Sequence, residues 1–155
     1  MRTVPLLALL LLTACVPTQP LFDWPRDPLT DAERADLFAN IGPAQRDSYG
    51  YAPEDAVRIG RFGPFKGMRA SAEMISHLRK DGQRLRVLGR SSRHTLRPDS
   101  STASQAPYGA PSEGTIVDGY VVVSESGADT LLLYFDPYYS SPLHAPSGLE
   151  WSVGP

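Results

Sequence analysis

Hydrophobic positions along the chain recur with two spacings, one typical of helices and one typical of strands. Apolar residues three or four apart predict a helix over Met68–Lys80, with charged residues on its opposite side. A shorter helix is predicted over Asp31–Asn40, because Thr30 and Glu33 have the spacing of a capping box. We expect the longer helix to pack on a sheet and the shorter one to lie nearby.

Alternating or continuous apolar runs predict strands at Ala56–Phe62, Arg84–Arg90, Thr115–Ser124 and Thr130–Asp136. The short segment between the last two strands fits a hairpin loop. We therefore predict an α+β fold, with a small antiparallel sheet of about four strands and one or two packed helices. The alternative is a mixed sheet whose first two strands run parallel around a right-handed crossover.

Stretches without hydrophobic rhythm divide the chain. Residues 1–14 have the character of a signal peptide, and the proline-rich residues 15–28 that of an extended tether. Residues 29–139 are of single-domain size. Within them, residues 91–114 are rich in Ser, Pro, Ala and Gly and predict a long flexible loop. The tail, residues 140–155, is expected to wrap the surface or fray.

The first residues have the order of an export signal. Arg2 precedes the apolar run Val4–Leu12, which is far shorter than the roughly 20 residues that cross a bilayer as a helix. The quartet Leu12-Thr13-Ala14-Cys15 resembles the lipobox of bacterial lipoproteins. The resemblance implies cleavage before Cys15, attachment of diacylglycerol and an acyl chain such as palmitate, and anchoring of the mature protein in a membrane.

The residue after the cysteine bears on which membrane holds the anchor. It is Val16, whereas an aspartate at this place is the usual inner-membrane retention signal of proteobacterial lipoproteins. The resemblance therefore implies the outer membrane, with the domain facing the periplasm, and leaves the inner membrane as the alternative. Cys15 is the only cysteine, so a lipidated chain has no intramolecular disulfide. The alternative interpretation of Cys15 is an ordinary buried thiol of a cytosolic protein.

A second resemblance concerns the segment from Val57 to Leu88. The sequences "VRIGRF" and "ASAEMISHLRKDGQRLRVL" resemble half of a sporulation-related (SPOR) repeat, a strand, helix and strand module that binds peptidoglycan. That family has a second helix between its last two strands, whereas only "ESGAD" separates the two last strands predicted in this chain.

Charge is distributed unevenly behind a net value of −2. Residues 58–97 hold eleven Lys and Arg and two acids, whereas from Asp99 onward there are seven acids and no Lys or Arg. Strict alternation would place Arg84, Arg86 and Arg90 on one face of their strand. They are candidate residues for binding an anionic glycan, lipid or protein of the envelope, and nothing suggests nucleic acid. The alternative is internal pairing with the acidic strands.

Aromatic residues gather where the last predicted strand ends. Tyr134, Tyr138 and Tyr139 surround Asp136, and such a cluster can form a platform for sugars or peptides. A strand leaving the core would produce the same pattern. Asp136 and Asp118 lie on neighbouring predicted strands, so a paired-carboxylate hydrolase of the envelope is an alternative function.

The remaining chemistry is sparse. His77, His94 and His144 are not at ligand spacing, so neither a metal nor another cofactor is predicted. The glycines of "IGRFGPFKG" lack the ending of a phosphate-binding loop and indicate a turn. We therefore expect a non-enzymatic binding or assembly module of the cell envelope, with a SPOR-like peptidoglycan-binding module or a hydrolase as the alternatives.

Overall fold

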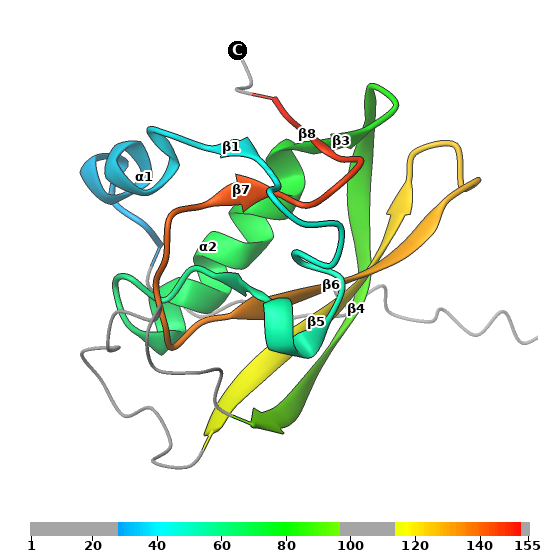
Figure 1. Ribbon diagram of the computed structural model, residues 1–155. Coiled ribbons are helices and arrows are strands. Elements are labelled where there is room, and N and C mark those ends of the chain that lie inside the picture. The colour runs from blue at the N-terminus through cyan, green and yellow to red at the C-terminus, as the bar shows by residue number, and fades with distance from the viewer. Residues whose placement is uncertain (1–27, 97–113, 153–155) are drawn as a thin grey trace, which may run out of the picture.

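The computed structural model describes residues 28–96 and 114–152, and in them two helices and a curled mixed sheet form an α+β fold (Figure 1). The six strands of the sheet are, in spatial order, β2 (Val57–Arg58), β6 (Thr130–Asp136), β5 (Gly114–Ser124), β4 (Gln83–Leu96), β3 (Leu78–Lys80) and β8 (Glu150–Trp151). Helix α2 (Pro64–His77) lies across one face, and α1 (Asp31–Phe38) lies beyond it.

The sheet is larger than predicted and is not purely antiparallel. The expected β4–β5–β6 antiparallel core is present, but β2 pairs parallel with β6 and β8 adds to β3. The alternative prediction of a mixed sheet is confirmed. Its expected pairing of the first two predicted strands, β2 and β4, is wrong because β6 and β5 lie between them. The predicted first strand is also reduced to Val57–Arg58.

Helix α2 begins and ends earlier than its hydrophobic pattern predicts. Gly63, at φ 90°, turns the chain into the helix, and Pro64 occupies the first turn, where a missing N–H costs nothing. Leu78 has an extended conformation and starts β3. The hydrophobic pattern of the helix includes Leu78 because this residue is apolar and buried, although it belongs to the following strand.

Helix α1 has the predicted capping box. The hydroxyl of Thr30 accepts a hydrogen bond from the backbone N–H of Glu33 at 3.2 Å, and the Glu33 carboxylate accepts one from the N–H of Thr30 at 2.9 Å. Ion pairs of Glu33 with Lys66 and of Arg34 with Glu73 join α1 to α2. The hydrogen bond from Lys66 is the main reason why the pKa of Glu33 is lowered.

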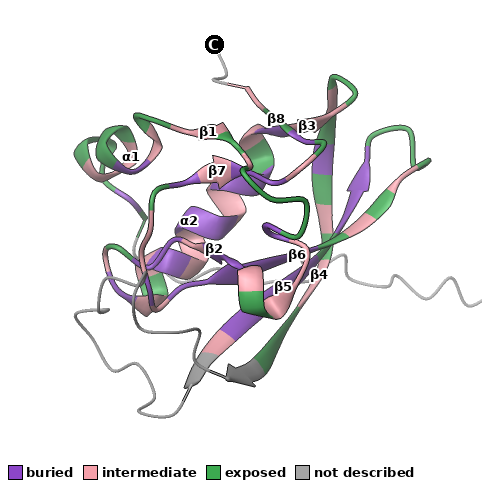
Figure 2. Cartoon of the chain, in the orientation of Figure 1, coloured by how far each residue is buried: buried purple, intermediate pink, exposed green. Residues whose placement is uncertain are grey.

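The main core lies between α2 and the sheet (Figure 2). Its fully buried side chains include Met74 and Ile75 from α2, and Tyr120 and Phe135 from β5 and β6. The rings of Tyr120 and Phe135 meet edge to face at 5.5 Å. None of the helices in the described residues is long and apolar enough to span a membrane.

The C-terminal tail belongs to the folded unit and extends it past residue 139. Strand β7 (His144–Ala145) pairs parallel with β1 (Gly42–Pro43), and Leu143 and Leu149 join the main core. The described part of the tail, which was expected to wrap the surface or fray, therefore supplies core residues.

Strand β4 continues through residues predicted to begin the flexible loop. Residues 91–96 pair with β5 one by one, from Ser91 opposite Gly119 to Leu96 opposite Gly114. The predicted loop start was wrong because a long partner strand, not an apolar alternation, holds this segment in the sheet. The rest of the predicted loop, residues 97–113, lies outside the described residues.

Candidate functional site: two faces of strand β4

A bulge in β4 separates the predicted row of arginines. The register with β5 shifts between Val87 and Gly89 and leaves Leu88 without a partner. Cross-strand partners share a face of the sheet, so Val87, opposite Val122, and Arg90, opposite Tyr120, both lie on the face that α2 covers. Before the bulge the odd-numbered residues of β4 face α2, and after the bulge the even-numbered residues do.

Arg90 consequently lies inside the fold. Its Nη2 donates to both carboxylate oxygens of Asp118, at 2.9 and 2.8 Å, and the hydroxyl of Ser92 donates to Asp118 Oδ1 at 2.7 Å. Asp118 is 1% exposed. The prediction that Arg90 shares a binding face with Arg84 and Arg86 was wrong, because Arg90 is the internal partner of a buried acid.

The polar group around Asp118 also affects a buried tyrosine. Burial raises the pKa of Tyr120, and the negative charge of Asp118 raises it further. Asp118 and its neighbours are therefore a structural network within the core.

The opposite side of the sheet carries cations without acidic partners. Arg84, Arg86 and Arg93 are exposed, and none of them forms an ion pair within the described ranges 28–96 and 114–152. Arg93 belongs to this group because it pairs with Val117, which lies on the side away from α2. Arg84 also lies opposite Arg79 of β3, a like-charged pair that disfavours the folded state.

Three exposed apolar side chains lie among these arginines. Leu88, Val121 and Leu132 are 41%, 37% and 39% exposed. Val121 pairs with Leu132 on one side and with Gly89 on the other, and Leu88 precedes Gly89, so the three exposed residues are neighbours in the sheet. We name the surface made by Arg84, Arg86, Leu88, Arg93, Val121 and Leu132 the open face.

One end of this side of the sheet is covered. The 3-10 helix η1 (Pro53–Asp55) precedes Ala56, which packs with Val117 and Tyr134 in a second, small core. The carbonyl oxygen of Gly50 accepts a hydrogen bond from the N–H of Tyr134 at 2.8 Å. The open face is the part of the sheet that this segment leaves uncovered.

The tyrosines do not form the predicted platform. Tyr134 and Tyr139 are buried, at 7% and 2% exposure, and only Tyr138 is partly accessible. Asp136 Oδ1 accepts hydrogen bonds from the backbone N–H groups of Tyr138 and Tyr139, at 2.8 and 3.2 Å. The cluster therefore marks the point where β6 leaves the sheet, which was the alternative interpretation.

The two candidate carboxylates do not converge. Asp118 pairs with Phe135, so the next residue, Asp136, projects from the opposite face. Both carboxylates are 1% exposed and hold local structure. The paired-carboxylate hydrolase is contradicted by this geometry.

Two of the three histidines, His77 and His144, contact the tail or belong to it. His77 Nδ1 lies 3.1 Å from the carbonyl oxygen of Ser152, and His144 meets the ring of Tyr49 edge to face at 5.7 Å. His94 is on β4. Among the described residues, no three His, Cys, Asp or Glu side chains are grouped as a metal site requires.

Cys15 and the rest of the lipobox lie outside the described residues, so lipidation stays a prediction. Sequence reasoning missed Arg93, Val121 and Leu132 as surface residues. The one available signal was Gly89, because a glycine inside a strand often marks a bulge. Comparison with family models, curated proteins and solved structures gives no match to this chain.

Proposed function

We propose that this protein is an outer-membrane lipoprotein that acts as a non-enzymatic binding module, and that its open face docks on an anionic membrane surface. The observation that carries the proposal is that exposed Arg84, Arg86 and Arg93, which form no ion pair with any described residue, lie with exposed Leu88, Val121 and Leu132. Such a surface offers both of the attractions that hold a protein at a lipid interface.

The electrostatic attraction is sufficient to matter. Each basic residue near an anionic membrane contributes about 1 kcal/mol, so three arginines together contribute about 3 kcal/mol. The exposed apolar side chains add the transfer of hydrocarbon from water to the headgroup boundary. Because no described acid neutralises the arginines, this energy is available for a partner.

The predicted anchor supports the same function. A lipid on Cys15 would keep the domain near a bilayer, and the segment Val16–Pro28 reaches at most about 45 Å when extended. Within that distance, a weak surface contact acts at high effective concentration. The anchor and the open face together would hold the module in one orientation.

A sedimentation experiment tests the proposal. A soluble Cys15→Ser chain that starts at residue 15, and so lacks both the predicted signal peptide and the lipid, is mixed with phosphatidylglycerol vesicles, phosphatidylcholine vesicles or purified peptidoglycan, at low and at moderate salt. We expect binding to phosphatidylglycerol alone, weakened by salt because charges are screened over about 8–10 Å. Binding to peptidoglycan alone would contradict the proposal and favour the SPOR-like alternative.

Matched charge reversals locate the contact. Arg84→Glu with Arg86→Glu changes the open face, whereas Arg61→Glu with Lys80→Glu makes the same change in net charge elsewhere. Arg61 forms an ion pair with Asp36 of α1. Lys80 pairs with Gln83, and because it follows Arg79 in β3, its side chain projects from the face of the sheet opposite to Arg79 and Arg84. Only the first pair should weaken vesicle binding, and equal loss in both would show a general charge effect.

A further inference from the structure

One edge of strand β4 has no strand partner over most of its length in the part of the chain that the structure describes. Strand β3 pairs with Gln83 and Arg84 only, whereas β5 pairs with β4 as far as Leu96. From Leu85 onward, no strand in the described part of the chain occupies the edge away from β5. Such an edge presents backbone N–H and C=O groups that can pair with another chain.

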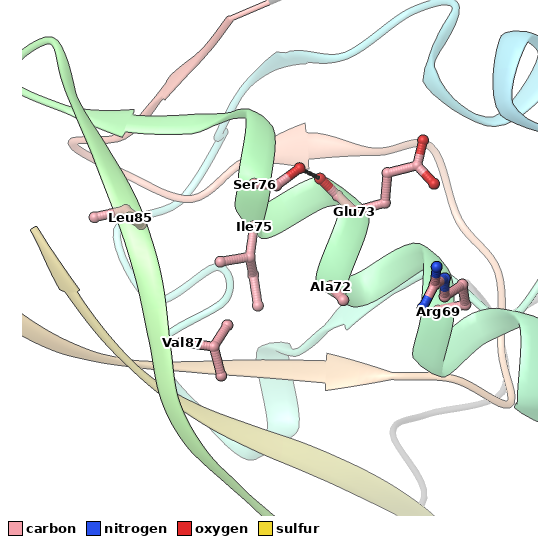
Figure 3. Close-up of a pocket in the computed structure, with 7 residues that line it drawn as sticks. All are labelled: Arg69, Ala72, Glu73, Ile75, Ser76, Leu85 and Val87. Carbon is pink, nitrogen blue, oxygen red and sulfur yellow. Dashed lines mark hydrogen bonds between the residues drawn. The ribbon is translucent and has the colours of Figure 1, made fainter. Parts of the chain in front are cut away.

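A groove runs beside this edge on the side of α2 (Figure 3). It has a volume of about 400 Å³, and its lining residues are Arg69, Ala72, Glu73, Ile75, Ser76, Leu85 and Val87. Ile75 of α2 and Val87 of β4 project toward the same space between helix and strand. Because the lining includes β4 but no residue of β5, the groove opens at the margin of the sheet.

The charge around the groove selects its occupant. Strand β4 contains four arginines and no acid, so pairing with the same strand of a second copy would place arginines together. In the groove, Glu73 is already paired with Arg34. Arg69 is partly buried and has no ion pair among the described residues. The surface is therefore complementary to an acidic partner.

We propose that an extended acidic peptide segment adds to β4 as a further strand over Leu85–Arg93. Its backbone pairs with the open edge, and every second side chain faces the groove, where apolar residues fill the space and a carboxylate on the same face lies beside Arg69. The groove that receives every second side chain lies on the helix side of the sheet, opposite the open face. The module can therefore hold a protein partner while its open face contacts a membrane.

Amide NMR of the soluble Cys15→Ser chain tests the peptide site. The probe is a synthetic blocked peptide, Val-Thr-Glu-Thr-Val-Thr-Glu-Thr-Val, in which Val and Glu share one face of an extended chain, and its control has Lys in place of each Glu. We expect the acidic peptide to shift and protect the amides of residues 85–93 and the lysine peptide to leave them unchanged. Shifts confined to other residues, or equal effects of both peptides, would overturn the proposal.

Two variants probe the groove. Ala72→Trp fills the groove and Arg69→Glu reverses its cation, and each should weaken peptide binding by at least about tenfold. The matched controls, Ala128→Trp in the β5–β6 hairpin and Arg61→Glu, should bind as wild type does. Arg69→Glu should leave vesicle binding unchanged, which separates this site from the open face. Unchanged peptide affinity of a folded Arg69→Glu variant would overturn the proposal.

Hydrogen exchange in the free chain distinguishes a competing occupant. If the edge is open, amides of residues 85–93 that point away from β5 exchange faster than those bonded to β5. Uniformly slow exchange would show that another part of this chain already covers the edge, and would contradict the peptide site.

Discussion

Arg90 and Asp118 form an ion pair across β4 and β5, with Arg90 Nη2 2.8 Å from Asp118 Oδ2, on the face that α2 covers. The pair exists because the bulge at Leu88 turns the following residues over. A regular strand would have placed Arg90 beside Arg86 on the open face and left Asp118 in the core without this cation.

Removing Arg90 should destabilise the fold. Arg90→Ala leaves the Asp118 carboxylate buried without its cation, and breaking a buried pair typically costs about 3–5 kcal/mol. Urea denaturation measures the change in the free energy of unfolding. The control is Arg84→Ala, an exposed site where the change should stay within about 0.5 kcal/mol.

A double substitution keeps this test interpretable if Arg90→Ala does not fold. Arg90→Met with Asp118→Asn removes both charges and should recover most of the loss. Equal stability of Arg90→Ala and Arg84→Ala would show that the buried pair is energetically unimportant.

Two glycines should respond in opposite ways to alanine. A Cβ at Gly60 would lie 2.3 Å from the carbonyl oxygen of Pro137, whereas a Cβ at Gly89 would meet nothing within 4 Å. Gly60→Ala should lower the free energy of unfolding by about 1–3 kcal/mol, and Gly89→Ala by less than about 0.5 kcal/mol. Thermal unfolding compares them, and a large loss at Gly89 would contradict the described bulge.

The tail should be needed for stability. Leu143 is 6% exposed in the main core, whereas Leu132 is 39% exposed on the open face. Leu143→Ala should cost about 2–5 kcal/mol in urea denaturation. Leu132→Ala should cost much less because it leaves no cavity. Equal losses of unfolding free energy in Leu143→Ala and Leu132→Ala would contradict the described packing of the tail.

Stability should fall at high pH partly because of Tyr49. Burial raises its pKa from 10 to about 12, although the N–H of His144 donates to its hydroxyl at 3.3 Å. A folded-state pKa above the unfolded value gives stability that is complete below pH 10 and lost as the pH rises toward 12. Tyr49→Phe should therefore show a shallower decline in unfolding free energy over this range. Parallel declines in the two proteins would contradict the buried phenol.

Local chemistry made some elements predictable. The capping box at Thr30 and Glu33 involves neighbouring residues, so the sequence identified α1 directly. The β5–β6 hairpin was equally clear, because two strongly apolar strands flank a short polar turn. Both features depend on contacts close in the sequence.

Long-range pairing was not predictable in the same way. Strands β7 and β8 have two residues each, and their partners, β1 and β3, lie far away in the chain. No periodic pattern can emerge from so few residues. The pairing of residues 91–96 likewise depends on β5 rather than on their own composition.

The prediction of the site residues was wrong mainly because one extra residue, Leu88, forms a bulge in β4. A single bulge exchanges the two faces of a strand, so the pattern placed Arg90 on the surface and missed Arg93. Gly89 is the one residue in the sequence that could have indicated a bulge, and a glycine alone does not show which neighbouring residue is unpaired. Arg84 and Arg86 are exposed on one side of the sheet as the alternation predicts, whereas Arg90 lies on the other side, and the role of the basic surface in binding stays a prediction.

The most direct test of the open face is the affinity of two folded variants of the soluble chain for phosphatidylglycerol vesicles. Arg93→Ala removes one cation of the open face, whereas Arg90→Met with Asp118→Asn removes the internal ion pair, and circular dichroism checks the fold of both. The open face predicts that Arg93→Ala weakens binding by roughly fivefold, the loss of about 1 kcal/mol, and that the double variant binds as wild type does. Unchanged affinity of Arg93→Ala, or a loss only in the double variant, would contradict the assignment of these arginines to opposite sides of the sheet.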